Sequence, residues 1–271
     1  METAFSAAAQ QVSAAAPTET AAPPETAAPE AVSAASPATS APADALTLRP
    51  IGHLHTDFPT KFGIPRQGTL VDGLRSTLVF APPYRDAAML RGIEGFSHLW
   101  LVWQFSASEG WSPTVRPPRL GGNTRMGVFA TRAPFRPNPI GLSCVRLVAV
   151  RQDAALGSVL ELAGADLMDG TPILDVKPYL PHADCHPEAT GGFALPLAEK
   201  ALRVECPAAL LAALPPEKRP ALLAVLAQDP RPAYQNDPAR VYGFGFAGCE
   251  VRFTVADGVL TVRSVTPKAY K

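Results

Sequence analysis

Arginines gather in one glycine- and proline-rich segment of this chain. Residues 110–152 hold seven arginines, no lysine and no acidic residue. The planar guanidinium group binds phosphates, carboxylates or base edges through two parallel hydrogen bonds, whereas lysine acts as a point charge. Glycine and proline fix unusual backbone paths that hold such groups in a stiff loop. The segment therefore indicates an anion or nucleic-acid site, with a solvated basic loop as the alternative.

A second segment, 166–179, reads DLMDGTPILDVKPY and follows a predicted strand. It places three carboxylates, Asp166, Asp169 and Asp175, close to Lys177. One such carboxylate could hold ribose hydroxyls or offset a cationic ligand, and another could act as a general base. Asp169-Gly170 is also a turn signal, so a purely structural role for Asp169 stays open.

Histidines and cysteines form no convincing metal site. His53 and His55 point the same way on a predicted strand, and His182 and His186 flank Cys185. Zinc could bind such pairs, but their spacing is loose and no acid completes either pair. The four cysteines lack a CxxC pair, which favours incidental thiols in a reducing cytosol. We therefore expect no metal, and a metal-dependent hydrolase is the weakest of the functions considered.

Near the C-terminus, the sequence DPRPAY at 229–234 follows a predicted helix. As structure it is a helix stop, because a residue that precedes proline disfavours helical backbone. As function it would place Arg231 and Tyr234 side by side for phosphate contact and base stacking. The spacing supports both interpretations equally.

Composition separates the first 46 residues from the rest. Residues 1–46 are almost wholly Ala, Pro, Ser, Thr and Glu, which predicts a disordered tail. The tail holds five of the 24 acids and no Lys or Arg, which leaves 24 basic against 19 acidic residues in the body. That excess favours a polyanionic partner. No transit peptide, secretory signal or apolar run of roughly 18 residues is present, so we expect a cytoplasmic protein without a membrane span.

The body of the chain predicts many short strands and few helices. Strands are expected at 46–53, where Pro50 suggests a sheet edge, and at 98–105, an apolar run that we expect to be buried on both faces. Further strands are predicted at 70–71, 76–80, 126–131, 142–150, 158–163 and 173–179. Short strands between Gly and Pro turns favour a mostly β fold, a compact β-barrel.

After residue 186 the pattern changes. Residues 187–197 suggest a linker, followed by helices at 207–214 and 220–228 and strands at 241–246, 250–255 and 259–265. Asp257-Gly258 stands where a tight hairpin turn is needed. We therefore predict a tail at 1–46, a barrel at 47–186 and a small α+β C-terminal domain at 187–271.

Several motifs together resemble one family. PRQ at 65–67, FSHLW at 96–100 and RPPRLGG…MGVFATR..FRPNPIGLS at 116–143 are similar to the TrmO/YaeB (TsaA-like) family. DLMDGTPILDVKPYLP at 166–181 and QDPRPAY at 228–234 extend the match. These motifs are long and follow in order along the chain, and the resemblance reaches from about residue 48 to the C-terminus.

The resemblance implies a TsaA-like β-barrel that uses S-adenosylmethionine and acts as a homodimer. The family methylates N6 of threonylcarbamoyladenosine next to the anticodon in certain threonine tRNAs. That nitrogen is a poor nucleophile because its lone pair is delocalised into the carbonyl, so the enzyme must help to remove its proton. By location, the candidate catalytic residues are Asp169, Asp175 and Lys177.

The resemblance also assigns binding roles. The cofactor pocket would use Pro65, Arg66, Gln67, His98, Leu99, Arg132, Leu142, Asp166, Leu167, Met168 and Asp169. The tRNA would contact Arg116, Arg119, Arg136, Asn138 and, in the C-terminal domain, Asp229, Arg231 and Tyr234. The arginine-rich segment then becomes the tRNA-facing surface, whose affinity should fall steeply with salt. The alternative function is a non-catalytic RNA- or nucleotide-binding barrel, which would have no need of a methionine pocket.

Overall fold

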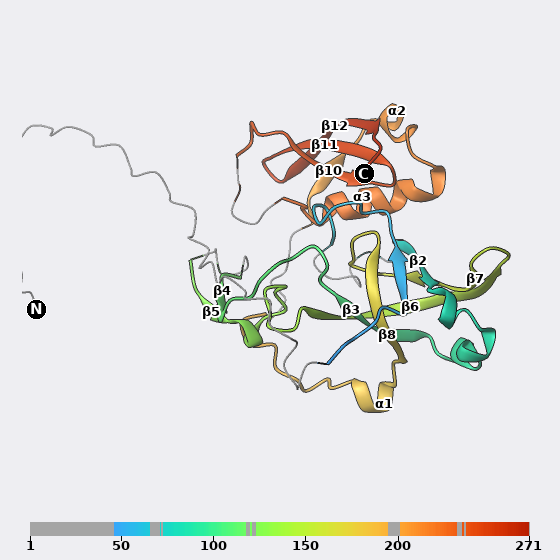
Figure 1. Cartoon of the computed structure of the whole chain (residues 1–271). Coiled ribbons are helices and arrows are strands. Elements are labelled where there is room, and N and C mark those ends of the chain that lie inside the picture. The colour runs from blue at the N-terminus through green and yellow to red at the C-terminus, as the bar shows by residue number, and fades with distance from the viewer. Residues whose placement is uncertain are drawn as a thin grey trace, which may run out of the picture. The chain divides into compact units, whose positions relative to one another are not determined.

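The computed structural model describes residues 46–65, 71, 73–117, 120, 123–194, 201–231, 235 and 237–270 (Figure 1). The predicted tail falls outside these residues except for Leu46, and the chain from Thr47 onward forms one compact unit. The strands are β1 (Gly52–His55), β2 (Arg75–Phe80), β3 (His98–Gln104), β4 (Thr114–Val115), β5 (Met126–Gly127), β6 (Ile140–Asp153), β7 (Gly157–Ala163), β8 (Thr171–Pro178), β9 (Arg203–Glu205), β10 (Tyr242–Phe246), β11 (Cys249–Ala256) and β12 (Val259–Pro267).

Helices are short and lie mainly between strands. The α-helices are α1 (Pro181–Asp184), α2 (Ala208–Leu211) and α3 (Arg219–Ala227). The 3-10 helices are η2 (Pro82–Tyr84), η3 (Ala87–Leu90), η4 (Ile93–Gly95), η6 (Val128–Ala130), η7 (Gly192–Ala194) and η8 (Pro216–Lys218).

A closed barrel forms the larger part of the described chain. Its strand order is β1-β2-β7-β6-β3-β8, and each neighbouring pair is antiparallel. The long strand β6 pairs first with β3 and then with β7, and bulges between Leu147 and Ala149 and between Val102 and Trp103 help the sheet to curve. The expected mostly β fold with a compact barrel is confirmed.

The interior of the barrel is filled by its own side chains. Seven apolar residues are fully buried in this core: Leu54, Leu78, Leu99, Leu101, Leu160, Leu162 and Ile173. Small barrels hold side chains rather than a channel, because their diameter grows with the number of strands. A ligand of this barrel therefore has to bind at its rim or on its outer wall.

The C-terminal residues form a second sheet with the order β10-β11-β12-β9. The helix α3 buries Ala221, Leu222, Val225 and Leu226 in the core of this part. The predicted Asp257-Gly258 turn joins β11 to β12, and both residues have positive φ, 50° and 75°, as a tight hairpin turn of the mirror-image type requires. The short strand β9, parallel to β12, was not predicted.

Five local expectations were wrong. The strand expected at 126–131 ends at Gly127 and continues as η6, because Thr131 N donates to Val128 O at 3.1 Å within the turn, and Arg136 Nη1 braces that turn through the carbonyls of Val128 and Thr131. The strand expected at 46–53 begins only at Gly52, after Pro50, which has no N–H to donate. At 70–71, Val71 lies outside any strand, and Leu70 is outside the described residues.

The helix expected at 207–214 is α-helical only over Ala208–Leu211, since prolines follow at 215 and 216. The run at 98–105 is a strand, as expected, but it is not buried on both faces. Leu99 and Leu101 point into the core and are fully buried, whereas Trp100 and Val102 on the outer face are only half-buried. The outer wall of a single-sheet barrel has no second sheet to cover it.

Residues 56–65, which we call the strap, follow β1 and attach to the C-terminal core. The Asp57 carboxylate accepts from Lys218 Nζ at 2.7 Å, and its backbone carbonyl accepts from Ala247 N at 2.8 Å. Phe58 is fully buried and meets the ring of Phe246 edge to face at 5.5 Å. Two independent polar contacts and one aromatic contact thus hold the strap against the second sheet.

Gly63 carries the sharpest steric constraint in the strap. Its φ is +84°, and a Cβ placed on it would lie 2.1 Å from the Phe244 ring. Only glycine combines that conformation with so close an approach. The strap therefore reaches Pro65, the first residue of the PRQ motif, along a path that the C-terminal core dictates.

We predict that Gly63→Ala lowers the free energy of unfolding by about 2–4 kcal/mol, the sum of a left-handed backbone and overpacking. The matched control is Gly92→Ala, since Gly92 has φ +86° with nothing within 4 Å of the added Cβ. The control should lose only about 1 kcal/mol for its backbone. Urea unfolding of both variants measures the difference, and equal losses would show that Phe244 moves aside freely.

Candidate active site

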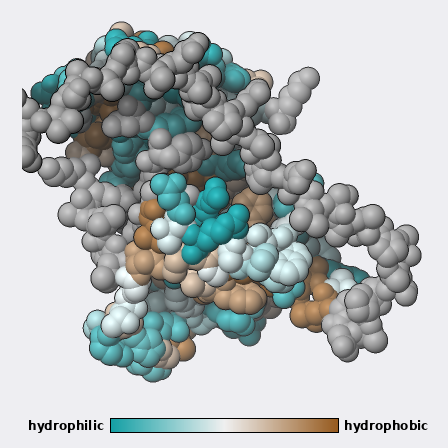
Figure 2. All heavy atoms as spheres, turned by 90° about the vertical axis from the view of Figure 1, so that its left-hand side faces the viewer, coloured by the Kyte–Doolittle hydropathy of each residue, from teal (hydrophilic) through white to brown (hydrophobic). Residues whose placement is uncertain are grey.

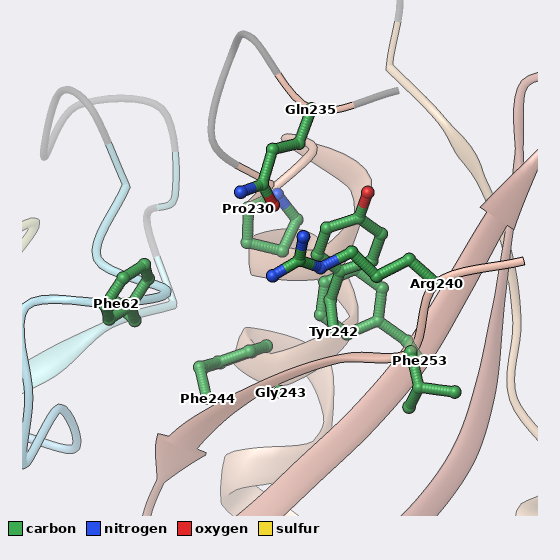
Figure 3. A pocket seen from close by; sticks show the side chains of 9 residues that line it. Phe62, Pro230, Gln235, Arg240, Tyr242, Gly243, Phe244 and Phe253 are labelled. Carbon is green, nitrogen blue, oxygen red and sulfur yellow. The ribbon is translucent and has the colours of Figure 1, made fainter. Parts of the chain in front are cut away.

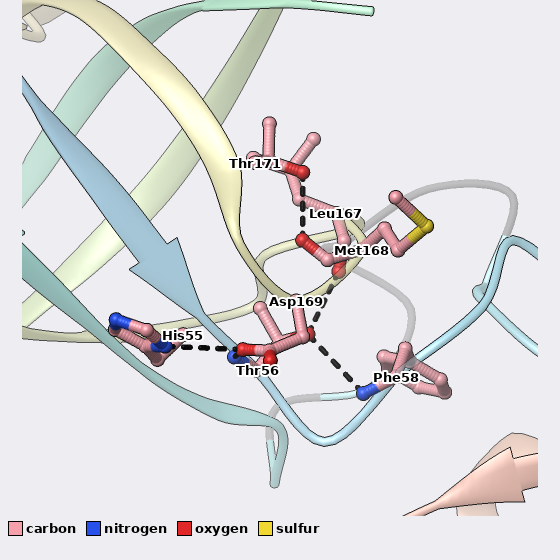
Figure 4. Close-up of polar contacts among 7 residues, drawn as sticks. All are labelled: His55, Thr56, Phe58, Leu167, Met168, Asp169 and Thr171. Atoms are coloured by element: carbon pink, nitrogen blue, oxygen red, sulfur yellow. Dashed lines mark hydrogen bonds and ion pairs between the residues drawn. The ribbon is translucent and has the colours of Figure 1, made fainter. Parts of the chain in front are cut away.

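The run 166–169 lies at the rim of the barrel between β7 and β8 and is tied to β1. Leu167 is buried in the barrel core, so the acids on either side of it are held at fixed positions. The Asp169 Oδ1 atom accepts from Thr56 N at 3.0 Å and lies 3.3 Å from His55 Nδ1 (Figure 4). These partners are more than 100 residues away in sequence, which makes the carboxylate more than a local turn feature.

Thr56 is the centre of the contacts at the rim. Its Oγ1 donates to Leu167 O at 3.0 Å and accepts from Phe58 N at 3.2 Å (Figure 4). In return, Asp169 N donates to Phe58 O at 2.7 Å. The turn expected at Asp169-Gly170 is also present, with Gly170 at φ 75°. The structural and the binding interpretations of Asp169 are therefore compatible.

Asp166 is anchored from the opposite side. Ser143 Oγ on β6 donates to Asp166 Oδ1 at 2.8 Å, and Trp103 Nε1 on β3 donates to Ser143 Oγ at 3.2 Å. Ser143 is buried, so its hydroxyl is positioned by packing as well as by hydrogen bonds. Sequence reasoning missed both Ser143 and Thr56, because single hydroxyl residues beside apolar strands give no signal of their own.

The outer wall brings together residues from three strands. In the register of the sheet, Val102 on β3 stands opposite Leu142 on β6 and opposite Asp175 on β8, so the three side chains form one row. Directly opposed residues of antiparallel strands share a face. Leu142 is 52% exposed. Lys177 Nζ lies 2.9 Å from Asp175 Oδ2, and both side chains are about half exposed to solvent.

The other residues expected at a cofactor pocket lie in different parts of the barrel domain. Leu99 is fully buried in the barrel core, so only its backbone could touch a ligand. His98 lies on the outer face of β3, where its Nδ1 is 2.9 Å from Ser97 Oγ. Arg132 is exposed and Met168 is half-buried. Pro65 ends the strap, while Arg66 and Gln67 are outside the described residues.

The part of the arginine-rich segment that precedes β6 lies in the long connection between β3 and β6. The small β4–β5 sheet braces this connection. Arg125 Nη1 donates across this sheet to Thr114 Oγ1 at 2.7 Å. Arg136 Nη1 donates to the carbonyls of Val128 and Thr131, at 3.1 and 2.7 Å, so it braces the loop.

The surface of this connection mixes charge with apolar side chains. Arg116, Arg132 and Asn138 are exposed, and Arg119 is outside the described residues. Trp111, Phe129 and Phe135 are also exposed. On the face that carries β4 and β5, hydrophilic and hydrophobic groups lie next to one another (Figure 2). Such a surface can combine phosphate contacts with stacking.

Arg231 in the C-terminal part has a partner in its own turn. Its Nε and Nη2 atoms donate to the two oxygens of Asp229, each at 2.7 Å, and its side chain is only 12% exposed. These hydrogen bonds, with a smaller contribution from Tyr242, raise the pKa of Arg231. Asp229 has φ 52°, a conformation that the pair helps to hold. Tyr234 is outside the described residues.

Metal ligands do not gather anywhere in the described residues: no three His, Cys, Asp or Glu side chains lie close enough to hold an ion. All four cysteines are free thiols, and burial raises the pKa of Cys144, Cys206 and Cys249. None of the helices in the described ranges has the length and apolar character that a membrane span requires.

We predict that Asp169→Ala destabilises the chain by about 1 kcal/mol through the lost contact between the rim and the strap. The Thr56 amide should then exchange its hydrogen faster, because Asp169 Oδ1 is its acceptor. Asp175→Ala is the matched control, since that carboxylate has a similar exposure but accepts only from its own neighbours, Val176 N and Lys177 Nζ. Unchanged exchange at Thr56 in Asp169→Ala would contradict the role of Asp169 as the tie.

Comparison with known proteins matches both parts of the chain. The tRNA-methyltransferase O N-terminal domain family matches residues 53–185, and the TrmO C-terminal domain family matches residues 200–268. A tRNA (adenine(37)-N6)-methyltransferase of Escherichia coli K12 is 43% identical over 80% of this chain and 97% of its own length. One of the same name from Eikenella corrodens is 49% identical over 63% of this chain and 97% of its own length.

Solved structures agree with the sequence match. A crystal structure of TrmO from Pseudomonas aeruginosa, 33% identical in sequence, superposes with a TM-score of 0.66 and covers 82% of this chain and 99% of its own. The fold is therefore shared over most of the length of both chains. This chain belongs to the tRNA-methyltransferase O family.

Proposed function

We propose that this chain transfers a methyl group from S-adenosylmethionine to N6 of threonylcarbamoyladenosine next to the anticodon of threonine tRNA. The coarser activity, S-adenosylmethionine-dependent methylation of tRNA, follows from its membership of the family. The observation that carries the proposal is the match of both parts of the chain to the family, together with 43% identity to a relative named for adenine 37. The threonylcarbamoyl group and the threonine tRNA rest on the resemblance of the motifs.

The rim of the barrel fits the cofactor by the chemistry of its residues. Asp166 and Asp169 are carboxylates that the contacts with Ser143 and Thr56 hold in place, and carboxylates suit ribose hydroxyls. Leu142 supplies an apolar contact on the adjoining wall, and Leu167 and Leu99 support the site from the core. When bound, S-adenosylmethionine supplies an electrophilic methyl group on its sulfonium.

The protein's own chemical task is to remove the proton from N6. A general base must come within about 2.6–3.2 Å of the atom it deprotonates. Asp169 and Asp175 are both about half exposed and so accessible to a bound nucleotide. Lys177, which lies 2.9 Å from Asp175, would steady the carboxylate or the developing negative charge of the substrate. We keep Asp169, Asp175 and Lys177 as the candidate catalytic residues.

Binding of tRNA is assigned to the arginine-rich connection and to the C-terminal domain. Arg116 and Asn138 are exposed and available for the phosphate backbone. Arg136 and Arg231 act on RNA through the loops they brace, because both guanidinium groups already have protein partners. Arg119, Asp229 and Tyr234 complete the set proposed from the motifs.

Assembly, location and domain boundaries are further elements of the proposal. A homodimer is supported by apolar side chains exposed along the outer face of β6, namely Ile140, Leu142 and Val148. A cytoplasmic location suits an enzyme that must reach tRNA. The boundary at 46 is supported by the compact unit that begins at Thr47. The boundary at 186 is supported by two hydrophobic cores, although Phe58, Val71 and Leu74 from the first part pack in the core under the second sheet.

We predict that labelled methyl groups pass from S-adenosylmethionine to tRNA from cells that make threonylcarbamoyladenosine, and not to tRNA from cells that cannot make it. Liquid scintillation counting of the two pools measures this. Label in both pools would keep the methyltransferase but discard the proposed nucleotide. Label in neither, with S-adenosylmethionine failing to raise the melting temperature of folded protein, would favour the non-catalytic barrel.

We also predict that Arg231→Ala weakens tRNA binding about tenfold and leaves stabilisation by S-adenosylmethionine intact, because the turn at 229–231 loses its internal pair. Arg203→Ala is the matched control, since Arg203 also pairs with an acid two residues away, Glu205, but on an exposed strand. Filter binding and thermal melting measure the two properties. Equal loss of both in Arg231→Ala would assign the residue to the stability of the fold.

A further inference from the structure

A pocket of about 260 Å³ opens beside the C-terminal sheet. Its lining residues do not include Thr56, Asp166 or Asp169, which form the contacts at the barrel rim. Its lining comes from β10, β11, the connection that follows α3 and the strap (Figure 3). Pockets for drug-sized ligands have about 300–1,000 Å³, so this one suits a smaller planar fragment. Nothing in the proposed catalytic cycle uses it so far.

The walls of the pocket are aromatic. Tyr242 and Phe253 stack with their ring centroids 5.7 Å apart and 25° between planes, and Phe244 meets Phe253 edge to face. These three rings also serve the hydrophobic core. Phe62 does not, because it is 53% exposed and faces the other lining residues from the strap (Figure 3). An exposed ring at the mouth of an aromatic pocket contributes little to the hydrophobic core but can stack on a ligand.

The polar groups of the pocket lie at one edge. The Arg240 guanidinium stands 5.7 Å from the centroid of the Tyr242 ring, and the Gln235 amide points toward it beside Pro230 (Figure 3). Asp237 fixes the approach of Arg240, since its carboxylate accepts from Ala239 N and its carbonyl accepts from Arg240 N. The edge therefore offers both donors and an acceptor in planar groups.

The Tyr242 hydroxyl adds to this edge. The residue is only 8% exposed, and its hydroxyl lies close to the Arg231 guanidinium, which it can accept from. A hydroxyl that accepts one hydrogen bond keeps its own proton to donate to a ligand. The lining residues in the described ranges include no acid, so an anionic polymer is not repelled.

We propose that this pocket holds an unstacked nucleobase of the tRNA loop, with the base between Phe62 and the Tyr242 side of the pocket and its edge read by Arg240, Gln235 and the Tyr242 hydroxyl. Proteins that recognise single-stranded RNA combine aromatic stacking with hydrogen bonds to base edges in this way. The proposal rests on the proposed function for the identity of the RNA. It adds a base contact, supplied partly by the strap, to the phosphate contacts already assigned.

The position of Phe62 gives the pocket a connection to catalysis. Phe62 lies one residue before Gly63 and three before Pro65, and Gly63 is packed against the Phe244 ring. A base bound against Phe62 would thus press on the segment that leads into the PRQ motif. Occupancy of the pocket would therefore bear on the backbone between Phe62 and Pro65.

The test measures tRNA affinity by filter binding, with tRNA purified from cells that carry the natural modifications, so that no step depends on methyl transfer. We expect Phe62→Ala to bind tRNA about 5- to 100-fold more weakly, the range for loss of one base–aromatic stack. Phe62→Tyr should bind like the wild type, whereas Phe62→Leu, which keeps the apolar bulk without a π face, should resemble Phe62→Ala. Met89→Ala, at an equally exposed apolar residue on the barrel, is the control.

The salt dependence of tRNA affinity distinguishes a lost contact with a base from a lost contact with a phosphate. Loss of one phosphate contact lowers the slope of log affinity against log salt by about 0.7–0.9, and loss of a stack does not. Phe62→Ala should therefore keep the wild-type slope. Arg240→Ala should also weaken binding, while Arg263→Ala, an equal loss of charge on the exposed strand β12, should not.

Two results would overturn the proposal: tRNA affinity of Phe62→Ala within twofold of the wild type, or Phe62→Leu binding as well as Phe62→Tyr, which would indicate an apolar partner instead. Failure of the proposed function is seen separately. If wild-type protein binds tRNA but labels neither pool, while Phe62→Ala binds weakly, the base pocket stands and the methyl transfer falls. If the wild type labels tRNA normally and Phe62→Ala binds tRNA within twofold of the wild type, the pocket falls alone.

Discussion

The structure depends on a ten-residue strap that must satisfy two partners at once. At its start, Thr56 is bound to Leu167 and Asp169 at the barrel rim. One residue later, Asp57 is paired with Lys218, and Phe58 is buried against the C-terminal core. A backbone fixed at both ends over so few residues has few conformations left. The position of Pro65 is therefore decided by packing in the C-terminal core as well as by the barrel.

The filled interior of the barrel explains why the chemistry gathers at the rim and on the outer wall. Buried apolar side chains, most of them leucines, fill the core and leave no room for a ligand there. Polar side chains at the ends of strands then become the available binding groups. Asp166 and Asp169 occupy that place because Leu167 between them is buried in the core. Leu167 thus completes the hydrophobic packing and holds the two neighbouring carboxylates at the rim.

Arginine serves two purposes in this chain. Arg136 and Arg231 bind backbone carbonyls and a neighbouring carboxylate, and so hold loops that lack regular secondary structure. Arg116 and Arg132 remain exposed. A guanidinium group can do both because it is always charged and offers five donors in a rigid plane. Some arginines of the segment therefore hold the loop in its conformation, and the others are displayed on the surface of that loop.

The sequence alone determined the fold class and most strands, because β3, β7 and the hairpin at Asp257-Gly258 depend on short apolar runs and turn chemistry. The order of its motifs determined the family. It also named Asp166, Asp169 and Asp175 as groups that could do chemistry. Only the tertiary structure decided their partners: the tie of Asp169 to Thr56, the row of Leu142, Val102 and Asp175, and the pocket between Phe62 and Tyr242. These contacts join segments 40 to 180 residues apart. They follow from strand register and core packing, which no local pattern of residues encodes.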